Sequence, residues 1–405
     1  MKKPLKILLK QITTLILFTV AFQAKAEESD QFTHWLNSLK IEASANGISK
    51  QTIDETFQSA QYLPRVIALD RSQPEFISPF LSYLESRVDA AKIARGRQML
   101  QTHEDLLMKV ETQYGVPKEI LVAFWGMETN YGSNKGNFGL PSALMTLAYE
   151  GRRSDFFRQQ LLDAMRIVDA KNSTVAGLRG SWAGAMGHMQ FMPSTFMKYG
   201  VDANADGRID LITSLDDAFA SASNYLSKVG WRKNEMVSIE VKLPANFDTK
   251  LAQLTERKST KEWIKLGVTG MNNTPLPAQD NAAILLPQGW QGPAIMVFSN
   301  FDVVMDWNRS VNYALSVSYL ARQLQSNQPL VGGAQAERSA LSVGQFWAMQ
   351  EKLNALGFDS GAPDGFPGLK TQAAIRQYQA TQQLPQDGYA SPSLYQRLFD
   401  KKPSK

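Results

Sequence analysis

The sequence predicts a mainly α-helical protein with a small α/β insert and a separate helical module at its C-terminal end. Apolar residues recur at helical spacing through residues 30–112, and glycine-rich turns separate further helical segments over residues 116–200. Alternation of the kind found in strands is confined to about residues 236–302. Residues 341–399 again carry a helical pattern of their own. A chain of 405 residues is long enough for more than one domain.

The first 26 residues predict a secretory signal. A basic start, MKKPLKILLK, precedes the apolar stretch ITTLILFTVAF and the small residues AKA at a cleavage position. The apolar part is shorter than the ~20 residues of a membrane span, so an uncleaved anchor is the lesser alternative. The signal holds five lysines and no acid, which leaves 38 basic and 38 acidic residues in the rest. We therefore predict no nucleic-acid partner.

The chain contains no cysteine. A disulfide framework, a thiolate nucleophile and a lipid-modified N-terminal cysteine are therefore excluded. We expect no membrane anchor once the signal has been cleaved.

Individual segments fit this organisation. QFTHWLNSLKIEA and SVNYALSVSYLARQLQ have helical spacing, whereas MVSIEVKLP alternates and AAILLPQGWQGPAIMVF predicts two short strands around a Pro/Gly turn. SNQPLVGGAQAERSA has the composition of a linker. The predicted domains are a main domain over residues 27–326, with its insert at about 236–302, a linker over 327–340 and a module over 341–400.

The stretch FWGMETNYGS contains a carboxylate at the end of an apolar helix face. Pro117 suits the first turn of this helix, and Ile120, Phe124 and Glu128 lie four residues apart on one face. Partial burial and the negative end of the helix dipole both disfavour the ionised carboxylate, as a general acid requires. A solvated glutamate at a helix end is the alternative.

A second stretch, GSWAGAMGHMQFMPSTF, combines small residues with isolated polar ones. Ser181 and Gln190 stand among glycines, alanines and apolar residues, and Pro193 is expected to start the next helix. The alternative is that small residues only allow close packing of helices.

Together these stretches resemble the lytic murein transglycosylases, specifically the membrane-bound lytic transglycosylase B family, over about residues 30–325. The likeness is carried by VPKEILVAFWGMETNYGSNKGNFGLPSALMTLAYEGRRSDFF, LRGSWAGAMGHMQFMPSTFMKYGVDANADGRIDL, ASASNYLSKVGWR and NFDVVMDWNRSVNYALSVSYL. The resemblance implies a lysozyme-like helical core with a helical N-terminal region. It also implies a periplasmic enzyme, without an organic cofactor, that cleaves the β-1,4 bond between N-acetylmuramic acid and N-acetylglucosamine in peptidoglycan.

The resemblance also assigns site residues. Glu128 matches the single catalytic carboxylate of the family. The expected substrate-binding residues are Ser181, Gln190, Trp307, Asn308 and Tyr313. Trp307 stands where an aromatic side chain supports the sugar, and core packing is the alternative for Trp307 and Tyr313.

One acid is enough for a transglycosylase. Glu128 would protonate the leaving oxygen and then accept the proton of the muramic acid 6-hydroxyl, which closes a 1,6-anhydro ring without water. Glu150 and Asp155 are the first acids that follow Glu128 along the chain, but surface ion pairing explains them better. A hydrolytic muramidase, which uses two carboxylates, and a non-catalytic wall-binding scaffold remain the alternatives.

The segment DANADGRIDLITSLDD begins like an EF-hand loop. Its expected calcium ligands are Asp202, Asn204, Asp206, the carbonyl of Arg208 and, by resemblance to the family, Asp216. Thr213 stands where an EF-hand has a bidentate glutamate. Calcium would be structural here, and a turn without metal is the alternative.

The last segment resembles a three-helix peptidoglycan-binding domain. LSVGQFWAMQEKLNALGFDSGAPDGFPGLKTQAAIRQYQATQQLPQDGYASPSLYQRL has the apolar helix positions and glycine turns of that domain. It contains no histidine or cysteine, so it offers no zinc-peptidase ligands. The implied function is attachment to the cell wall, and a stabilising appendage is the alternative.

Overall fold

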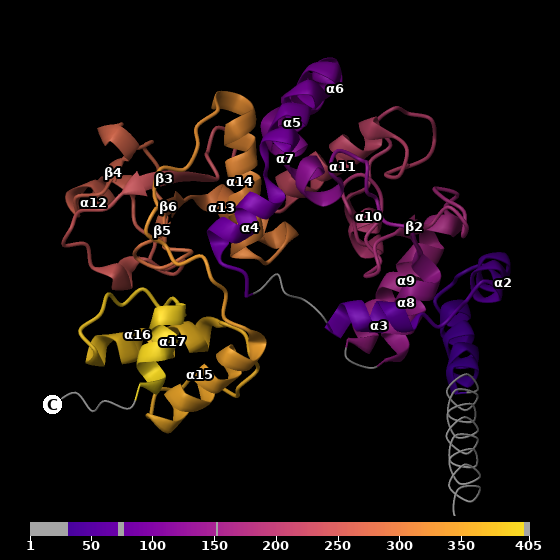
Figure 1. The fold of residues 1–405 in the computed structure, drawn as a ribbon. Coiled ribbons are helices and arrows are strands. Elements are labelled where there is room, and N and C mark those ends of the chain that lie inside the picture. The colour runs from indigo at the N-terminus through magenta and orange to yellow at the C-terminus, as the bar shows by residue number, and fades with distance from the viewer. Residues whose placement is uncertain (1–30, 72–76, 151–152, 401–405) are drawn as a thin grey trace, which may run out of the picture. The chain divides into compact units, whose positions relative to one another are not determined.

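The computed structural model describes residues 31–71, 77–150 and 153–400, so the predicted signal over 1–26 lies outside the described residues. The chain divides into two compact units. Of the described residues, the first comprises 31–71, 135–150 and 153–214, and the second comprises 77–134 and 215–400. Figure 1 labels the elements of both. Among the described residues, none of the helices combines the length and the apolar character that crossing a bilayer requires.

The first unit is helical. Residues 31–45 form its first described helix. The others are α2 (Lys50–Gln58), α3 (Pro64–Arg71), α8 (Leu140–Tyr149), α9 (Ser154–Asp169) and α10 (Pro193–Tyr199). α8 packs along α9, and α3 and α10 cover this pair. Proline at the start of α10 confirms the predicted helix start at Pro193. A two-stranded antiparallel sheet, β1 (Phe138–Gly139) with β2 (Arg179–Gly180), completes the unit.

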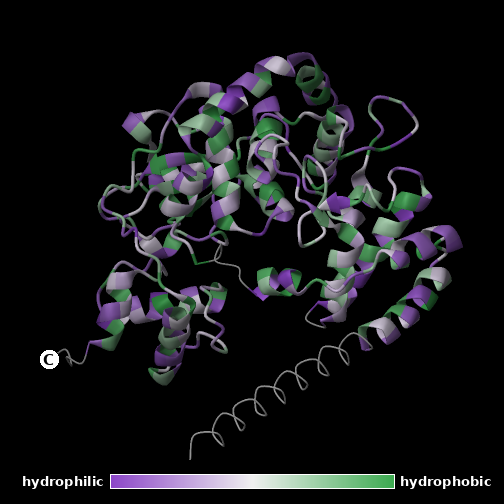
Figure 2. Cartoon of the chain, turned by 45° about the vertical axis from the view of Figure 1, so that its right-hand side comes forward, coloured by the Kyte–Doolittle hydropathy of each residue, from purple (hydrophilic) through white to green (hydrophobic). Residues whose placement is uncertain are grey.

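The second unit is built around one central helix. Its helices before the insert are α4 (Phe80–Arg87), α5 (Ala90–Thr102), α6 (Glu104–Tyr114), α7 (Lys118–Thr129) and α11 (Leu215–Lys228). Two more, α13 (Ser299–Trp307) and α14 (Val311–Ser326), follow the insert. Every residue of α7 from Ile120 to Gly126 is buried, because α5, α6, α11 and α14 surround it. Most of the other helices carry both hydrophobic and hydrophilic residues (Figure 2).

The predicted insert is a four-stranded antiparallel sheet in the order β4-β3-β6-β5. Its elements are β3 (Ser238–Lys242), η2 (Thr249–Leu251), α12 (Thr260–Lys265), β4 (Thr269–Gly270), η3 (Met271–Asn273), β5 (Ala283–Leu285) and β6 (Ala294–Val297). Ile239 pairs with Met296 across the central strands. Trp263 of α12 is fully buried against the sheet and donates its indole N–H to the Ala282 carbonyl at 3.0 Å.

Three helices form the C-terminal module. They are α15 (Val343–Ala355), α16 (Leu369–Thr381) and α17 (Pro392–Phe399), and they pack around Met349, Leu353 and Ile375. Gln350 is buried and bonds to Asp364 and Thr371, which ties α15 to the following loop and to α16. The predicted mainly α fold with a small α/β insert and a three-helix module is confirmed.

The segment between α14 and the module has no helix or strand over residues 327–342, yet it is held in place. The N–H groups of Val331 and Gly332 donate to the carboxylate of Glu240 at 2.9 and 2.6 Å. Glu240 lies in β3 and is only 4% exposed. Further on, Arg338 forms an ion pair with α4. A buried carboxylate needs such donors, so this segment contributes to the stability of the main domain.

Two truncations should separate this role from that of the module. A chain that ends after Gln328 leaves the buried Glu240 without two N–H donors, whereas a chain that ends after Arg338 keeps both. Each hydrogen bond to a charged group contributes about 1.5–3 kcal/mol to the free energy of unfolding, so we expect the shorter chain to melt several degrees lower. Thermal unfolding of the two chains measures the difference. Equal melting temperatures would show that the segment does not support Glu240.

Candidate active site

Glu128 is the penultimate residue of α7, and its side chain is partly exposed at the end of this buried helix. The helix stops because Asn130 and Tyr131 both take left-handed backbone conformations, with φ of 49° and 59°. The turn that follows fixes where α7 ends and therefore where the carboxylate is presented.

Two uncharged donors contact one oxygen of this carboxylate. Trp307 donates its Nε1–H to Glu128 Oε1 at 2.9 Å, and the Tyr313 hydroxyl donates to the same oxygen. Trp307 ends α13 and Tyr313 lies in the first turn of α14. Donors of this kind stabilise the ionised carboxylate and fix its orientation. Two donors occupy both lone pairs of Oε1, so a proton on the neutral acid belongs on Oε2.

The indole of Trp307 is fixed by other aromatic rings. Its ring centroid lies 4.6 Å from that of Phe124 and 5.2 Å from that of Tyr225, whose ring meets it edge-on. This arrangement packs the ring as well as aiming its N–H at Glu128. The direct contact of Trp307 with the acid was not part of the sequence-based expectation, which gave it a sugar-supporting role.

A close approach of backbone and ring explains the glycine in the middle of FWGMETN. A Cβ on Gly126 would lie 2.8 Å from the ring of Tyr131. Tyr131 donates its hydroxyl to the Lys92 carbonyl at 2.8 Å, and Lys92 Nζ donates to the Gly126 carbonyl at 3.0 Å. Burial lowers the pKa of Lys92, Arg87 lowers it further and Asp89 opposes them. No pattern in the sequence indicates Lys92 and Tyr131, since only the fold brings α5 to this turn.

The turn between α13 and α14 is held by its own polar side chains. Asn308 Oδ1 accepts from the Ser310 N–H at 3.1 Å, and Ser310 Oγ caps α14 by accepting from the Tyr313 N–H at 3.2 Å. The structure therefore brings Glu128, Trp307, Asn308 and Tyr313 into one region of the second unit.

Ser181 lies in the first unit, in a tight loop that only small residues permit. Its N–H donates to the Ala185 carbonyl at 2.7 Å, and its Oγ accepts from the Ala185 N–H at 3.0 Å. A Cβ on Gly180 would lie 2.0 Å from the Ala185 oxygen, and a Cβ on Gly136 would lie 2.2 Å from the Gly180 backbone. Contacts with backbone atoms thus explain the glycines at positions 136 and 180.

Gln190 bonds to backbone groups in and beside the same loop. Its Nε2 donates to the carbonyls of Lys135 and Gly187 at 3.1 and 3.0 Å, and its own φ is 49°. Both amide hydrogens therefore bond to backbone carbonyls, which leaves the amide oxygen as the group able to bind a ligand. Ser181 and Gln190 share one loop system in the first unit.

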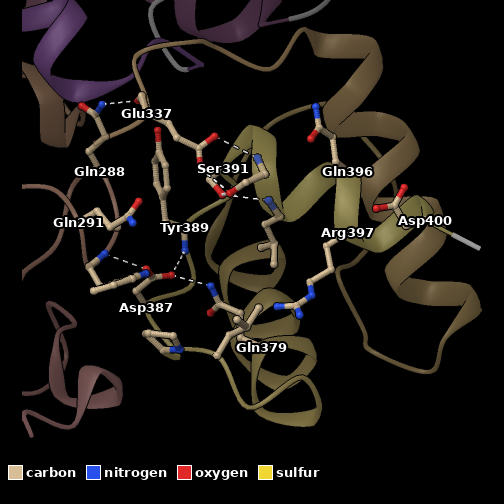
Figure 3. A pocket seen from close by; sticks show the side chains of 16 residues that line it. Gln288, Gln291, Glu337, Gln379, Asp387, Tyr389, Ser391, Gln396, Arg397 and Asp400 are labelled. Carbon is tan, nitrogen blue, oxygen red and sulfur yellow. Dashed lines mark hydrogen bonds between the residues drawn. The ribbon is translucent and has the colours of Figure 1, made fainter. Parts of the chain in front are cut away.

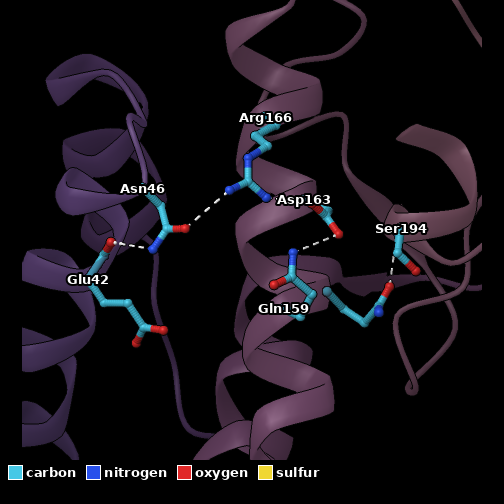
Figure 4. Close-up of polar contacts among 7 residues, drawn as sticks. Glu42, Asn46, Gln159, Asp163, Arg166 and Ser194 are labelled. Carbon is cyan, nitrogen blue, oxygen red and sulfur yellow. Dashed lines mark hydrogen bonds and ion pairs between the residues drawn. The ribbon is translucent and has the colours of Figure 1, made fainter. Parts of the chain in front are cut away.

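The helix that follows this loop is anchored by α9. Gln160 Oε1 accepts from the Ser194 N–H at 3.0 Å, at the start of α10. One turn further along α9, Arg166 pairs with Asp163 at 2.6 Å and reaches Asn46 at 3.3 Å (Figure 4). The bond between Gln160 and Ser194 ties the start of α10 to α9.

The first two acids that follow Glu128 in the sequence, Glu150 and Asp155, lie in the first unit. Glu150 accepts from the Tyr62 hydroxyl and pairs with Arg71 at 3.1 Å. Asp155 is an exposed residue in the first turn of α9. Glu150 therefore makes the ion pair expected of it from the sequence.

In the predicted calcium loop, side-chain oxygens accept hydrogen bonds from backbone N–H groups of the same loop. Asp202 accepts from the N–H groups of Asp206 and Gly207 at 3.2 and 2.9 Å, and Asn204 accepts from Asp206 at 3.0 Å. Asp206 in turn accepts from the Arg208 N–H at 2.9 Å. Gly207 supplies the sharp turn with φ of 88°.

The donor set of this loop fits calcium in its chemistry. Two carboxylates, one amide oxygen and a backbone carbonyl are hard oxygen ligands. Asp210, at loop position 9, is partly buried, which raises its pKa, but hydrogen bonds from Thr213 and Ile212 outweigh this and lower it. Asp216 belongs to the second unit, in the first turn of α11. Within the described part of the chain, no three His, Cys, Asp or Glu side chains gather as a metal site.

Two protein families match the chain. The family described as "Transglycosylase SLT domain" matches residues 31–322, and the family described as "Putative peptidoglycan binding domain" matches residues 347–398. The first match runs from before α2 into α14 and includes Glu128. The second covers most of the three-helix module.

Solved structures extend the likeness over the whole fold. SltB3 from Pseudomonas aeruginosa, solved in complex with NAG-NAM-pentapeptide and with NAG-anhNAM-pentapeptide, is 42% identical, with a TM-score of 0.88. The likeness covers 91% of this chain and 99% of SltB3. Slt35 from Escherichia coli, solved in complex with calcium, is 28% identical with a TM-score of 0.62, over 72% of this chain and 92% of that one.

A curated relative belongs to the same group. Membrane-bound lytic murein transglycosylase B of Escherichia coli (strain K12) is 29% identical over 298 residues, which are 68% of this chain and 78% of the relative. These likenesses confirm the predicted lysozyme-like helical core. The chain therefore belongs to the transglycosylase SLT domain family and is a lytic murein transglycosylase that carries a C-terminal domain of the peptidoglycan-binding family.

Proposed function

We propose that the protein cleaves the β-1,4 bond between N-acetylmuramic acid and N-acetylglucosamine in peptidoglycan, with Glu128 as its only catalytic acid and base. The observation that carries this proposal is the pair of donors on Glu128. Trp307 and Tyr313 both donate to one carboxylate oxygen, Oε1, and both are uncharged groups. A glycosidase that uses water normally has two carboxylates, whereas the family that the sequence resembles has one, which Glu128 matches.

In the first step Glu128 donates its Oε2 proton to the glycosidic oxygen, and the bond from C1 to that oxygen breaks. Positive charge develops at C1, which the oxygen of the sugar's own N-acetyl group stabilises. This group is attached to the same ring, so its effective concentration is very high. The newly ionised Glu128 is stabilised by the donors on Oε1.

In the second step the muramic acid 6-hydroxyl attacks C1. Glu128 accepts the proton of this hydroxyl, and the new bond from C1 to O6 closes a 1,6-anhydro ring. The enzyme returns to its protonated state, and water is not consumed. One carboxylate therefore serves as acid and then as base.

Other polar residues would bind the glycan. Asn308 lies in the turn beside Trp307 and can direct its amide N–H groups to an N-acetyl or hydroxyl oxygen. Ser181 and the Gln190 amide oxygen would bind sugar groups from the small-residue loop. Mass analysis of the cleavage products tests this proposal, because anhydro ends are one water lighter than hydrolytic ends.

The predicted signal and the matched families support a periplasmic location for this activity. A cleavable signal over residues 1–26 would deliver the enzyme to the periplasm, where peptidoglycan lies. The module over residues 341–400 would attach it to the wall.

The loop of Asp202, Asn204, Asp206 and Arg208, with Asp216, would hold calcium as a structural ion. The oxygen ligands of the loop support this, and Slt35 was solved in complex with calcium. Bound calcium supplies positive charge that offsets the repulsion between the loop carboxylates, and it takes no part in cleavage.

Calcium should raise the melting temperature. An ion that binds only the folded state stabilises it by about 2.7 kcal/mol at a concentration of 100 times its Kd, which is a rise of about 5 °C. Asp206→Ala should remove this rise. Asp54→Ala, which breaks only an exposed pair with Lys50, should keep it. A melting curve that neither calcium nor a chelator changes would mean that the loop is a turn without metal.

A further inference from the structure

One pocket of the second unit lies between the insert and the C-terminal module, apart from Glu128. It has a volume of about 420 Å³, within the range of small-molecule sites. Its lining comes from three segments (Figure 3). These are the β5–β6 turn at Gln288–Gln291, the side chain of Glu337, and the module from Gln379 to Asp400.

Hydrogen bonds make this pocket a rigid site. Gln288 is buried and donates to the Glu337 carbonyl at 2.6 Å. The N–H of Trp290 donates to Asp387 Oδ2 at 2.9 Å, while Asp387 Oδ1 accepts from Gln379 at 2.7 Å. The turn of the insert is thus fastened to the linker at Glu337 and to the module at Asp387.

This rigidity leaves a large aromatic side chain facing solvent. Trp290 is 54% exposed, although its backbone N–H is bonded to the buried Asp387. An exposed indole on a fixed backbone loses little conformational entropy when a ligand covers it. Its electron-rich face suits the C–H groups of a sugar ring.

The polar groups around Trp290 suit a neutral ligand. Arg397 is the only cation among the lining residues, against three carboxylates, Glu337, Asp387 and Asp400. An anionic peptide stem is therefore disfavoured by charge. Burial, with the charges of Glu337 and Asp387, raises the pKa of Tyr389 to about 12, so its hydroxyl stays protonated.

We infer that this pocket is a second glycan-binding subsite, which takes a neutral N-acetylated sugar of the strand with its ring against Trp290. The inference rests on the proposed action on peptidoglycan and gives the wall-binding module a defined site. The insert contributes the aromatic platform, and the module contributes Gln396 and Arg397 as hydrogen-bonding groups on α17. Neither part forms the subsite alone.

The test measures binding of full-length Glu128→Gln protein to glycan strands from which the peptide stems have been removed. Trp290→Ala should weaken binding by about tenfold or more, as loss of a central aromatic contact does. Trp290→Phe, which keeps a ring, should lose less. Trp347→Ala is the matched control, because Trp347 is 45% exposed on α15 and does not line the pocket. Equal binding by the Trp290→Ala and Trp347→Ala proteins, or no binding by the parent, would overturn the inference.

Competition identifies the ligand. A β-1,4-linked tetramer of N-acetylglucosamine should compete for the part of binding that depends on Trp290, and free peptide stem should not. The reverse pattern would overturn the inference. Cleavage of a short disaccharide-peptide dimer by Trp290→Ala with Glu128 intact is measured separately. The cleavage products test the proposed reaction, whereas strand binding tests the pocket. The proposed reaction and the proposed subsite can therefore fail independently.

Discussion

Glu128→Gln should abolish cleavage of peptidoglycan, with a loss of at least about 10³-fold in kcat. Proton transfer by a positioned group contributes about 10²–10⁴-fold, and this variant loses both the donor and the acceptor of the proton. An amide cannot protonate the leaving oxygen. Its oxygen can still accept the bonds of Trp307 and Tyr313, so the melting temperature should change by no more than a degree or two.

The matched control for this variant lies on the same helix. Glu119→Gln makes the same chemical change in the first turn of α7, and we expect it to keep full activity. Release of soluble fragments from sacculi measures both variants. Residual activity of Glu128→Gln within a few-fold of the parent would exclude Glu128 as the acid.

Tyr313→Phe should lower kcat by about 10- to 100-fold with KM within about twofold. The variant removes one hydrogen bond to a charged carboxylate, which contributes about 1.5–3 kcal/mol, while the ring stays. The ionised state of Glu128 loses a donor, so the alkaline limb of the rate profile should move to higher pH. A purely structural role of the hydroxyl would not move this limb.

Tyr319→Phe is the control, since Tyr319 lies on the same helix, α14, and is partly buried. It should leave both kcat and the pH profile unchanged. An unchanged pH profile for Tyr313→Phe would show that its hydroxyl does not act on the Glu128 carboxylate.

Local pattern was enough to predict most of the fold. Helical spacing predicted α14, and the Pro/Gly turn predicted β5 and β6, because these features depend on residues close in sequence. The two-residue strand β4 carries no comparable pattern. The segment over 327–340 was predicted as a linker from its composition, but its bonds to Glu240 join residues about ninety positions apart.

The candidate site was likewise predictable where it depends on local sequence and not where it depends on tertiary contacts. The position of Glu128 at the end of an apolar helix could be predicted from its helix alone. Its contacts with Trp307 and Tyr313 span 179 and 185 residues, and no local spacing encodes them. The reason for Gly126 is likewise a tertiary contact, the ring of Tyr131 lying over the helix backbone.

The central claim is that one carboxylate and the substrate's own groups replace a second acid and water. Mass spectrometry of sacculi digested in ¹⁸O-labelled water tests it most directly, with Glu128→Gln protein as the blank. We expect fragments that end in 1,6-anhydro-muramic acid and carry no label. Reducing ends that carry solvent ¹⁸O would contradict it and would identify a hydrolytic muramidase with a second carboxylate.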